Sequence, residues 1–264
     1  MILVDTHCHL DFNTFDTDRA NVLQRAVDRG LERILVPGID LESSQRAIQL
    51  AEANEHVFAA VGVHPNEALT WREDTLDILH QLTNHPKVVA IGEIGLDYYR
   101  DRAPKDLQAR IFQAQLDLAT EVGLPVVIHC RQAIEDILDY LETWQLNLVA
   151  QGSGLVMRPG VLHSYSGGRD AARRATQVNF LIGVTGPVTF PNANELRQTI
   201  SSLKLEDLLI ETDAPFLTPQ PYRGKRNEPA YVYYVAEKLA ELFNLAVDSV
   251  ASTTTINAGR IFNW

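Results

Sequence analysis

The chain of 264 residues carries 34 acidic side chains against 23 basic ones, which gives a formal net charge of −11. This charge argues against a protein that coats nucleic acid by electrostatics alone, although an enzyme that holds a few nucleotides locally stays compatible with it. No apolar stretch approaches the roughly 20 residues that a membrane-spanning helix needs, and we see no secretory signal at the N-terminus. The expected location is cytoplasmic.

The chain holds two cysteines, Cys8 and Cys130, and each stands next to a histidine. On a strand, neighbouring side chains point to opposite faces, so we expect both thiols to point away from those histidines. Small buried side chains are the interpretation we favour over a disulfide or a sulfur ligand.

Apolar, β-branched runs alternate with amphipathic helical patterns along the whole chain. The expected strands are residues 2–5, 33–37, 57–63, 88–93, 125–129, 160–163, 180–183 and 208–211. The expected helices are residues 19–29, 41–53, 75–83, 106–122, 134–143, 171–177 and 196–203, followed by 230–243 and 247–258. Residues 150–160 are rich in glycine and predict a flexible loop before the sixth strand.

Strands that alternate with helical crossovers predict a parallel sheet, and eight is the number of strands that closes a barrel. The sequence therefore predicts an α/β fold of the (β/α)8 TIM-barrel type. We expect one domain over residues 1–264, with extra C-terminal helices. In such barrels the active site lies at the C-terminal ends of the strands.

Histidines and carboxylates follow several of these apolar runs. His7 and His9 end the first strand, and the alternation of side chains makes both point the same way. The other candidates are Glu93, His129, His163 and Asp213. Each has a structural alternative, such as a salt bridge for Glu93 or a turn cap for Asp213. Their coincidence on one rim of the barrel predicts a metal site.

Further residues at this rim are candidates for substrate contact. We expect His64, at the end of the third strand, to contact substrate or handle protons rather than bind metal. Arg131 faces the same side as His129, and a guanidinium suits a phosphate oxygen, although a solvated helix start is an equal alternative. Arg223 lies in a basic loop after the last strand, where barrels often place phosphate sites.

Two weaker candidates complete the rim. Tyr98 and Tyr99 could stack a nucleobase, but we favour packing under a loop. Glu211 could accept a hydrogen bond from a ligand imidazole and so orient it.

Six motifs, in this order, resemble those of the TatD-type metal-dependent deoxyribonucleases, a branch of the amidohydrolase-like barrels. They are Asp5-Thr6-His7-Cys8-His9, Gly62-Val63-His64-Pro65, Gly92-Glu93-Ile94-Gly95-Leu96-Asp97, His129-Cys130-Arg131, His163-Ser164-Tyr165-Ser166-Gly167 and Glu211-Thr212-Asp213-Ala214-Pro215. The resemblance spans essentially the whole chain. It implies a binuclear divalent site with Glu93 bridging, one ion on His7, His9 and Asp213, and the other on His129 and His163. Such oxygen and imidazole donors suit magnesium, manganese or zinc.

The resemblance implies a deoxyribonuclease that holds DNA or another phosphodiester locally. Two ions that share a water lower its pKa and polarise a phosphoryl oxygen, so in-line attack is expected, with Asp213 and Glu93 catalytic and Asp213 taking the proton. One alternative is an amidohydrolase-type enzyme for an amide, lactone or ester. Many of those bridge their metals with a modified lysine, where this chain has Glu93. The other alternative is a metal-binding protein without turnover.

Overall fold

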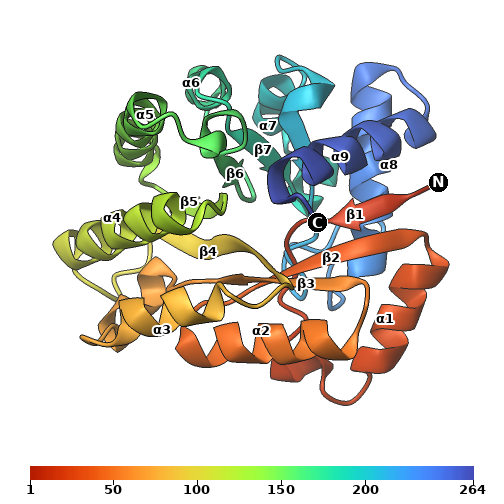
Figure 1. The fold of residues 1–264 in the computed structure, drawn as a ribbon. Helices are drawn as coiled ribbons and strands as arrows, with labels where there is room; N and C mark the ends of the chain where they lie inside the picture. Colours follow the sequence, from red (N-terminus) through yellow and green to blue (C-terminus); the bar gives the residue numbers. More distant parts are fainter.

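The computed structural model describes residues Met1–Trp264 and contains a ring of eight parallel strands with helices around it (Figure 1). Each strand pairs with the next one along the chain, from the first to the eighth. The strands are β1 (Leu3–Asp5), β2 (Leu31–Pro37), β3 (Val57–Val61), β4 (Val88–Asp97), β5 (Val126–Arg131), β6 (Gly160–Leu162), β7 (Leu181–Val184) and β8 (Leu208–Ile210). The predicted (β/α)8 barrel is therefore confirmed.

The ring closes between β8 and β1 through hydrogen bonds just past the strand ends. The backbone N–H of Asp213 donates to the carbonyl of His7 at 2.8 Å. Next to it, the buried carboxylate of Asp5 accepts hydrogen bonds from the N–H, at 2.9 Å, and the hydroxyl of Thr212. These bonds fix the start of the chain against a segment more than two hundred residues away.

Seven helices connect the strands and cover the outside of the ring (Figure 1). They are α1 (Arg19–Asp28), α2 (Leu41–Ala53), α3 (Thr75–Leu82), α4 (Lys105–Val122), α5 (Ile134–Ala150), α6 (Arg169–Gln177) and α7 (Asn194–Ile200). The start of α2 illustrates the local cause: the Asp40 carboxylate accepts a hydrogen bond from the Ser43 N–H at 2.7 Å. This capping contact satisfies one of the free N–H groups at the helix start.

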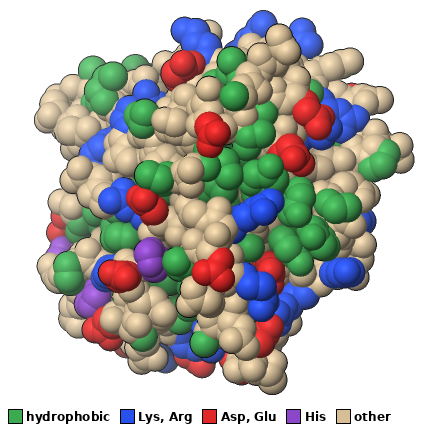
Figure 2. Space-filling model, turned by 90° about the vertical axis from the view of Figure 1, so that its right-hand side faces the viewer, with side chains coloured by type: hydrophobic (Ala, Val, Ile, Leu, Met, Phe, Trp, Pro, Cys, Tyr) green, Lys and Arg blue, Asp and Glu red, His purple; other side chains and the backbone are tan.

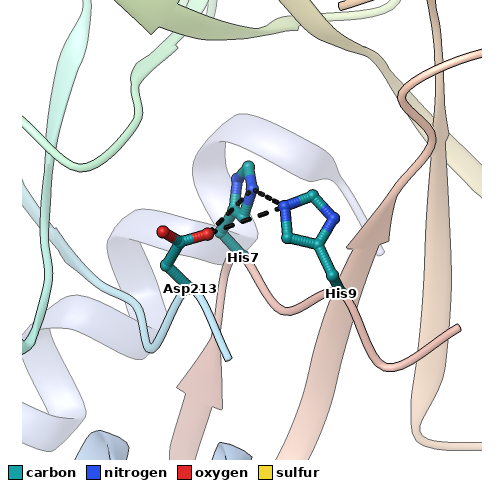
Figure 3. A group of neighbouring side chains, drawn as sticks. All are labelled: His7, His9 and Asp213. Carbon is teal, nitrogen blue, oxygen red and sulfur yellow. Dashed lines mark hydrogen bonds and ion pairs between the residues drawn. The ribbon is translucent and has the colours of Figure 1, made fainter. Parts of the chain in front are cut away.

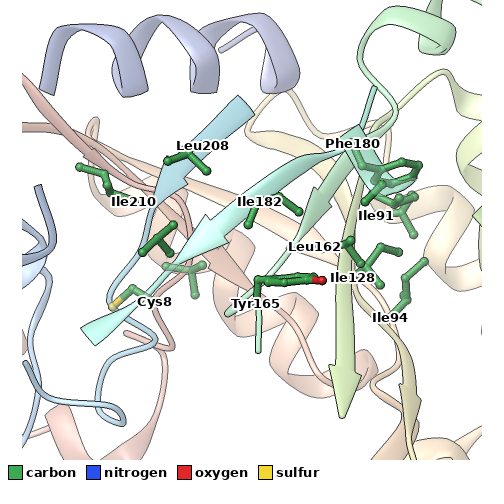
Figure 4. Packing of buried hydrophobic residues seen from close by; sticks show 14 of the residues in the cluster. Cys8, Ile91, Ile94, Ile128, Leu162, Tyr165, Phe180, Ile182, Leu208 and Ile210 are labelled. Atoms are coloured by element: carbon green, nitrogen blue, oxygen red, sulfur yellow. The ribbon is translucent and has the colours of Figure 1, made fainter. Parts of the chain in front are cut away.

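The core has two layers because strand side chains alternate in direction. Outward-facing residues such as Ile128 and Ile182 pack against the helices (Figure 4). Inward-facing residues such as Val127 and Leu209 fill the barrel.

Two extra helices, α8 (Val232–Phe243) and α9 (Val247–Phe262), follow β8, as the sequence predicts. Ile261 and Phe262 of α9 belong to the cluster that fills the barrel interior. The contacts of α9 with β1 and β8 place it at the N-terminal end of the ring. That end is thereby plugged, and the opposite end is left for a site.

Three local expectations need correction. Glu93 does not end the fourth strand, because β4 continues to Asp97 and pairs with β5 as far as Arg131. Helix α5 runs beyond residue 143 to Ala150 because its last two turns still bury apolar side chains, Trp144 among them. The predicted flexible loop contains a 3-10 turn, Gly154–Met157, that is anchored by the buried side chain of Leu155.

The face shown in Figure 2 agrees with the expectation from the net charge that the protein does not coat nucleic acid. Figure 2 views the molecule from the side of α1, α8 and α9, and shows acidic and basic side chains interspersed around an apolar area, with no continuous basic surface. No helix of the structure has the length and apolar character needed to cross a membrane.

Candidate metal centre

A pocket of about 640 Å³ opens at the C-terminal ends of the strands. Its lining includes His9, Glu93, His129, His163 and Asp213, which is five of the six predicted ligands. A volume of this size is typical of small-molecule and cofactor sites. The sixth ligand, His7, lies fully buried directly behind the pocket floor.

His7 and His9 converge from the end of β1, as the alternation of side chains requires (Figure 3). Their Nε2 atoms lie 3.3 Å apart. The Oδ1 atom of Asp213 lies 3.8 Å from the Nε2 of His7 and 3.6 Å from that of His9. Both imidazoles are buried, and neither Nδ1 has a hydrogen-bond partner. Buried polar atoms with no partner are costly, so this cluster is built for something other than packing.

Glu93 lies between two groups of histidines. Its Oε2 atom is 3.4 Å from the Nε2 of His7 and 3.6 Å from that of His9. Its Oε1 atom is 2.8 Å from the Nδ1 of His129 and 3.6 Å from the Nε2 of His64. The two oxygens of one carboxylate thus face two different sets of nitrogen atoms. This is the arrangement that a carboxylate bridging two cations requires.

His163 is held by a second carboxylate beneath it. Its Nδ1 donates to Glu211 Oε2 at 2.9 Å, and its Nε2 lies 3.7 Å from Asp213 Oδ1. Glu211 fits there because Gly183 has no side chain: a Cβ atom at that position would overlap the carboxylate. The interpretation of Glu211 as a residue that orients an imidazole agrees with this geometry.

His129 is held in a similar way from the extension of β4. Its Nε2 lies 3.2 Å from Asp97 Oδ2, an oxygen that also accepts a hydrogen bond from the Asn66 amide at 3.0 Å. The ring of His64 lies edge to face with that of His129, with centroids 4.2 Å apart. His64 therefore belongs to the cluster itself rather than only to its rim.

The structure brings all six predicted ligands together, but it groups them differently from the resemblance. Three triads have ligand atoms within 4.8 Å of one another: His7, His9 and Asp213; His7, Glu93 and His163; and His64, Glu93 and His129. The first agrees with the implied first ion. His129 and His163 share no triad, and His64, taken as a substrate contact, stands in one.

Burial and mutual charge perturb these groups strongly. Burial lowers the pKa of His9 well below its ordinary value and that of His64 to about 3, so both are neutral imidazoles with lone pairs to donate. Burial opposes ionisation of Glu93, but its contacts with the surrounding histidines, among them the hydrogen bond from His129, outweigh burial and hold its pKa well below the usual value. Burial raises the pKa of Asp213, which makes this carboxylate a better proton acceptor.

Burial and neighbouring charges act against each other on the remaining histidines. Burial by itself lowers the pKa of His163, but the charge of Glu211 outweighs it and raises the value to about 9. At His129, hydrogen bonds to Asp97 and Glu93 likewise outweigh burial and raise the pKa.

Of the two arginines predicted to contact substrate, only one lines the pocket. Arg131 lines the pocket, and its guanidinium lies 4.0 Å from the centroid of the Tyr99 ring. Arg223 lies over the ring of Phe190, 4.2 Å from its centroid, and is absent from the pocket lining. Its neighbour Arg226 is paired with Asp18 at 2.7 Å. The basic loop therefore does not bring its charges into the pocket.

The two cysteines differ in how deeply they are buried. Cys8 is completely buried in the outer core layer, as predicted. Cys130 is only half-buried, but it packs against the same outer core layer, so its direction agrees with the expectation while its burial is incomplete. Neither cysteine forms a disulfide.

Several pocket residues were missed in the sequence. Asp97 lies four residues after Glu93, beyond the expected end of the fourth strand, so the sequence did not single it out. Phe12 and Phe216 each follow a candidate ligand, His9 or Asp213, by three residues, which is a weak signal. Arg100 and Arg102 line the pocket from the segment after β4, where no pattern pointed to them.

A parallel barrel with a buried cluster of histidines and carboxylates at the C-terminal strand ends is the architecture of a metal-dependent hydrolase. A family model for TatD-related DNases matches residues 4–263, and the chain belongs to this family.

Solved and curated relatives agree over nearly the whole length. The crystal structure of YjjV, a TatD homologue from Escherichia coli, superposes with a TM-score of 0.91 at 35% identity and covers 99% of this chain and 98% of its own. The Bacillus subtilis protein YabD, named an uncharacterized metal-dependent hydrolase, is 43% identical, with 99% of each chain aligned. A Salmonella typhimurium relative named 3'-5' ssDNA/RNA exonuclease TatD is 36% identical, with 98% of each chain aligned.

Proposed function

We propose that the chain is a 3'-5' exonuclease that hydrolyses phosphodiester bonds in single-stranded nucleic acid with the help of two divalent metal ions. The observation that carries the proposal is the position of the Glu93 carboxylate, with Oε1 facing His129 and Oε2 facing His7 and His9. The names of the TatD relatives support the substrate and the direction of cleavage.

The residues present fit two cations. The Nε2 atoms of His7 and His9, which converge on Glu93 and Asp213, the neutral imidazole of His9 and the ionised Glu93 are donors that suit divalent ions. We assign His7, His9 and Asp213 to one ion, His129 and His163 to the other, and Glu93 to both. His64 is a further candidate for the second ion. Magnesium, manganese and zinc all suit this donor set. When bound, such a pair of ions lowers the pKa of a water molecule and stabilises charge on the phosphoryl oxygens.

The chain's own groups supply the remaining steps. Asp213 Oδ1, close to the Nε2 atoms of His9 and His163, would accept the proton of the water that attacks phosphorus. The P–O3' bond to the rest of the strand would break, and the leaving 3'-oxygen would take up that proton, which releases a 5'-mononucleotide. Arg131 binds a non-bridging oxygen of the substrate, for which its guanidinium offers paired donors. Glu211 keeps His163 oriented through the hydrogen bond to Nδ1.

We further propose that residues 1–264 act as one unit in a reducing, cytoplasmic environment. The two free cysteines support the reducing environment. A different hydrolase on the same barrel, acting on an amide, lactone or ester, is the second candidate, because the metal cluster alone does not select the substrate.

The decisive experiment compares wild-type protein with Glu93→Gln and Asp213→Asn. Labelled single-stranded DNA and RNA are assayed with each ion, beside a dipeptide, a dihydropyrimidine and a lactone. Both variants should lose metal-stimulated nuclease activity while circular dichroism shows the fold intact. Glu55→Gln, on a side chain that is 89% exposed, is the matched control and should keep full activity. Wild-type activity in either variant, or hydrolysis of only the other substrates, contradicts the proposal.

A further inference from the structure

One wall of the pocket is aromatic and apolar. The ring of Phe12 is stacked on that of the candidate ligand His9, with centroids 4.7 Å apart and planes 22° apart. The ring of Phe216 stands edge to face with both, 6.1 Å from Phe12 and 6.4 Å from His9. Pro187, Leu196 and Leu217 continue this wall. Phe216 is 52% exposed, an unusual state for so large an apolar side chain beside a buried cluster.

The opposite wall carries three arginines, one of which, Arg102, is paired with Glu67 at 3.6 Å. Arg100 and Arg102 follow β4, Arg131 ends β5, and all three line the pocket. Phe12 and Phe216 follow β1 and β8. In a ring of eight strands, these two pairs of strands lie on opposite sides, so the cluster of candidate ligands lies between the two walls. No arginine or lysine lines the aromatic wall.

Tyr98 and Tyr99, for which the sequence favoured packing over stacking on a base, are already engaged by other side chains. The ammonium of Lys105 lies 3.9 Å from the centroid of the Tyr98 ring, and the Tyr98 hydroxyl donates to Asp136 at 2.5 Å. The guanidinium of Arg131 covers Tyr99. Neither tyrosine lines the pocket, whereas Phe216 does.

We propose that Phe216, supported by Phe12, is the stacking platform for the base of the terminal nucleotide, and that the rest of the strand leaves across the arginine wall. The inference rests on the proposed function and deepens it. A terminal nucleoside has a base but no phosphodiester beyond the reacting one, so an aromatic wall without cations matches it. The remaining strand carries one negative charge for each linkage, and the three arginines match that.

Stacking on a ring reads no hydrogen-bond pattern, because every base has a π-face. The platform therefore accepts all four bases, of DNA or RNA, with little preference. It also follows that the terminal base must be unpaired in order to reach Phe216.

The test is a binding cycle with two oligonucleotides and several variants. Both oligonucleotides carry a fluorophore at the 5' end and a phosphorothioate at the last linkage to slow cleavage, and one has an abasic 3'-terminal residue. Affinity is measured by fluorescence anisotropy with the divalent ion present. Removing the base should weaken binding to the wild-type protein roughly tenfold, within the range found for base–aromatic stacking. Phe216→Ala should weaken binding of the intact oligonucleotide by a similar factor and binding of the abasic one almost not at all. The affinity of Phe216→Leu for the intact oligonucleotide should lie between those of wild type and Phe216→Ala.

Tyr99→Ala is the matched control, because Tyr99 is equally exposed at the same rim. It should weaken binding of both oligonucleotides by the same factor, through Arg131. Equal losses for Phe216→Ala on both oligonucleotides, or no loss on either, overturn the platform. Cleavage of the natural linkage by wild-type protein is followed in parallel. If the wild-type protein cleaves the natural linkage but binds both oligonucleotides equally well, the stacking platform is wrong and the proposed function stands. If it does not cleave, the proposed function itself is contradicted.

Discussion

Glu211 fixes the ring of His163: it accepts the hydrogen bond from Nδ1 at 2.9 Å and thereby leaves Nε2 directed at the centre. The same carboxylate oxygen accepts the N–H of Ser164 at 3.0 Å, so ring and backbone are held together. A histidine that binds metal commonly has such a carboxylate behind it, which raises the basicity of the ligating nitrogen.

Glu211→Gln keeps the shape of this side chain and removes its charge. We expect the affinity for divalent ions to fall about 10- to 100-fold, the range typical for loss of such a supporting carboxylate. Titration calorimetry on protein stripped of metal measures this directly. Glu55→Gln serves as the control and should bind metal like wild type. If Glu211→Gln also binds metal with wild-type affinity, His163 does not need Glu211.

Arg131 and Arg223 offer a matched pair, because both were predicted to bind phosphate and only Arg131 lines the pocket. Arg131→Ala should raise KM for phosphodiesters about 10- to 100-fold, since a charge-assisted hydrogen bond contributes about 1.5–3 kcal/mol. Arg223→Ala should change KM little. Initial rates at several salt concentrations separate a local contact from general electrostatic attraction. Equal effects of the two substitutions would remove Arg131 from the substrate site.

Removal of metal should destabilise the fold as well as stop hydrolysis. An ion present at about a hundred times its Kd stabilises the folded state by about 2.7 kcal/mol. For a protein of this size, each kcal/mol shifts Tm by about 2–4 °C, so chelation should lower Tm by roughly 5–10 °C. Differential scanning calorimetry with and without EDTA tests this. His9→Ala should show a smaller shift than wild type, and an unchanged Tm in wild type would contradict a cluster that holds ions.

Asn257 ties helix α9 to the plugged end of the barrel. Its side-chain N–H groups donate to the carbonyls of Leu205 and Leu208, both at 2.9 Å, in a buried position. Asn257→Ala removes two buried hydrogen bonds, although the Leu205 carbonyl keeps the N–H of Leu208 as a partner. At about 0.5–1.5 kcal/mol for each bond, the substitution should cost about 1–3 kcal/mol in urea unfolding. Ser252→Ala, exposed on the same helix, should stay within about 0.5 kcal/mol of wild type. Activity at low temperature should survive in both.

The architecture could be predicted from the sequence because all eight strands share one sequence pattern. Each is a short apolar run whose two faces are both buried, one in the barrel interior and the other against the surrounding helices. The expected limits of β2 and β8 differ from the observed ones by no more than two residues. Helix α5 was expected too short, because the buried residues of its last turns are diluted by exposed Leu146 and Val149.

The site was only partly predictable, for a different reason. His7 and His9 follow from the alternation of a single strand, and their convergence is local. Glu93 seemed to end its strand because a carboxylate is expected outside an apolar run, whereas pairing with β5 extends β4 past it. The exclusion of Arg223 depends on the loop conformation after β8, and no short-range pattern encodes that conformation.

The closure of the barrel between β8 and β1 also determines when the metal cluster can assemble during translation. His7 leaves the ribosome early, but Asp213 can reach it only after the eighth strand has been synthesised and has docked beside the first. Domains generally fold as units as they are made. A polypeptide that still lacks β8 therefore has His7 and His9 without Asp213, and the three-residue cluster cannot assemble in it.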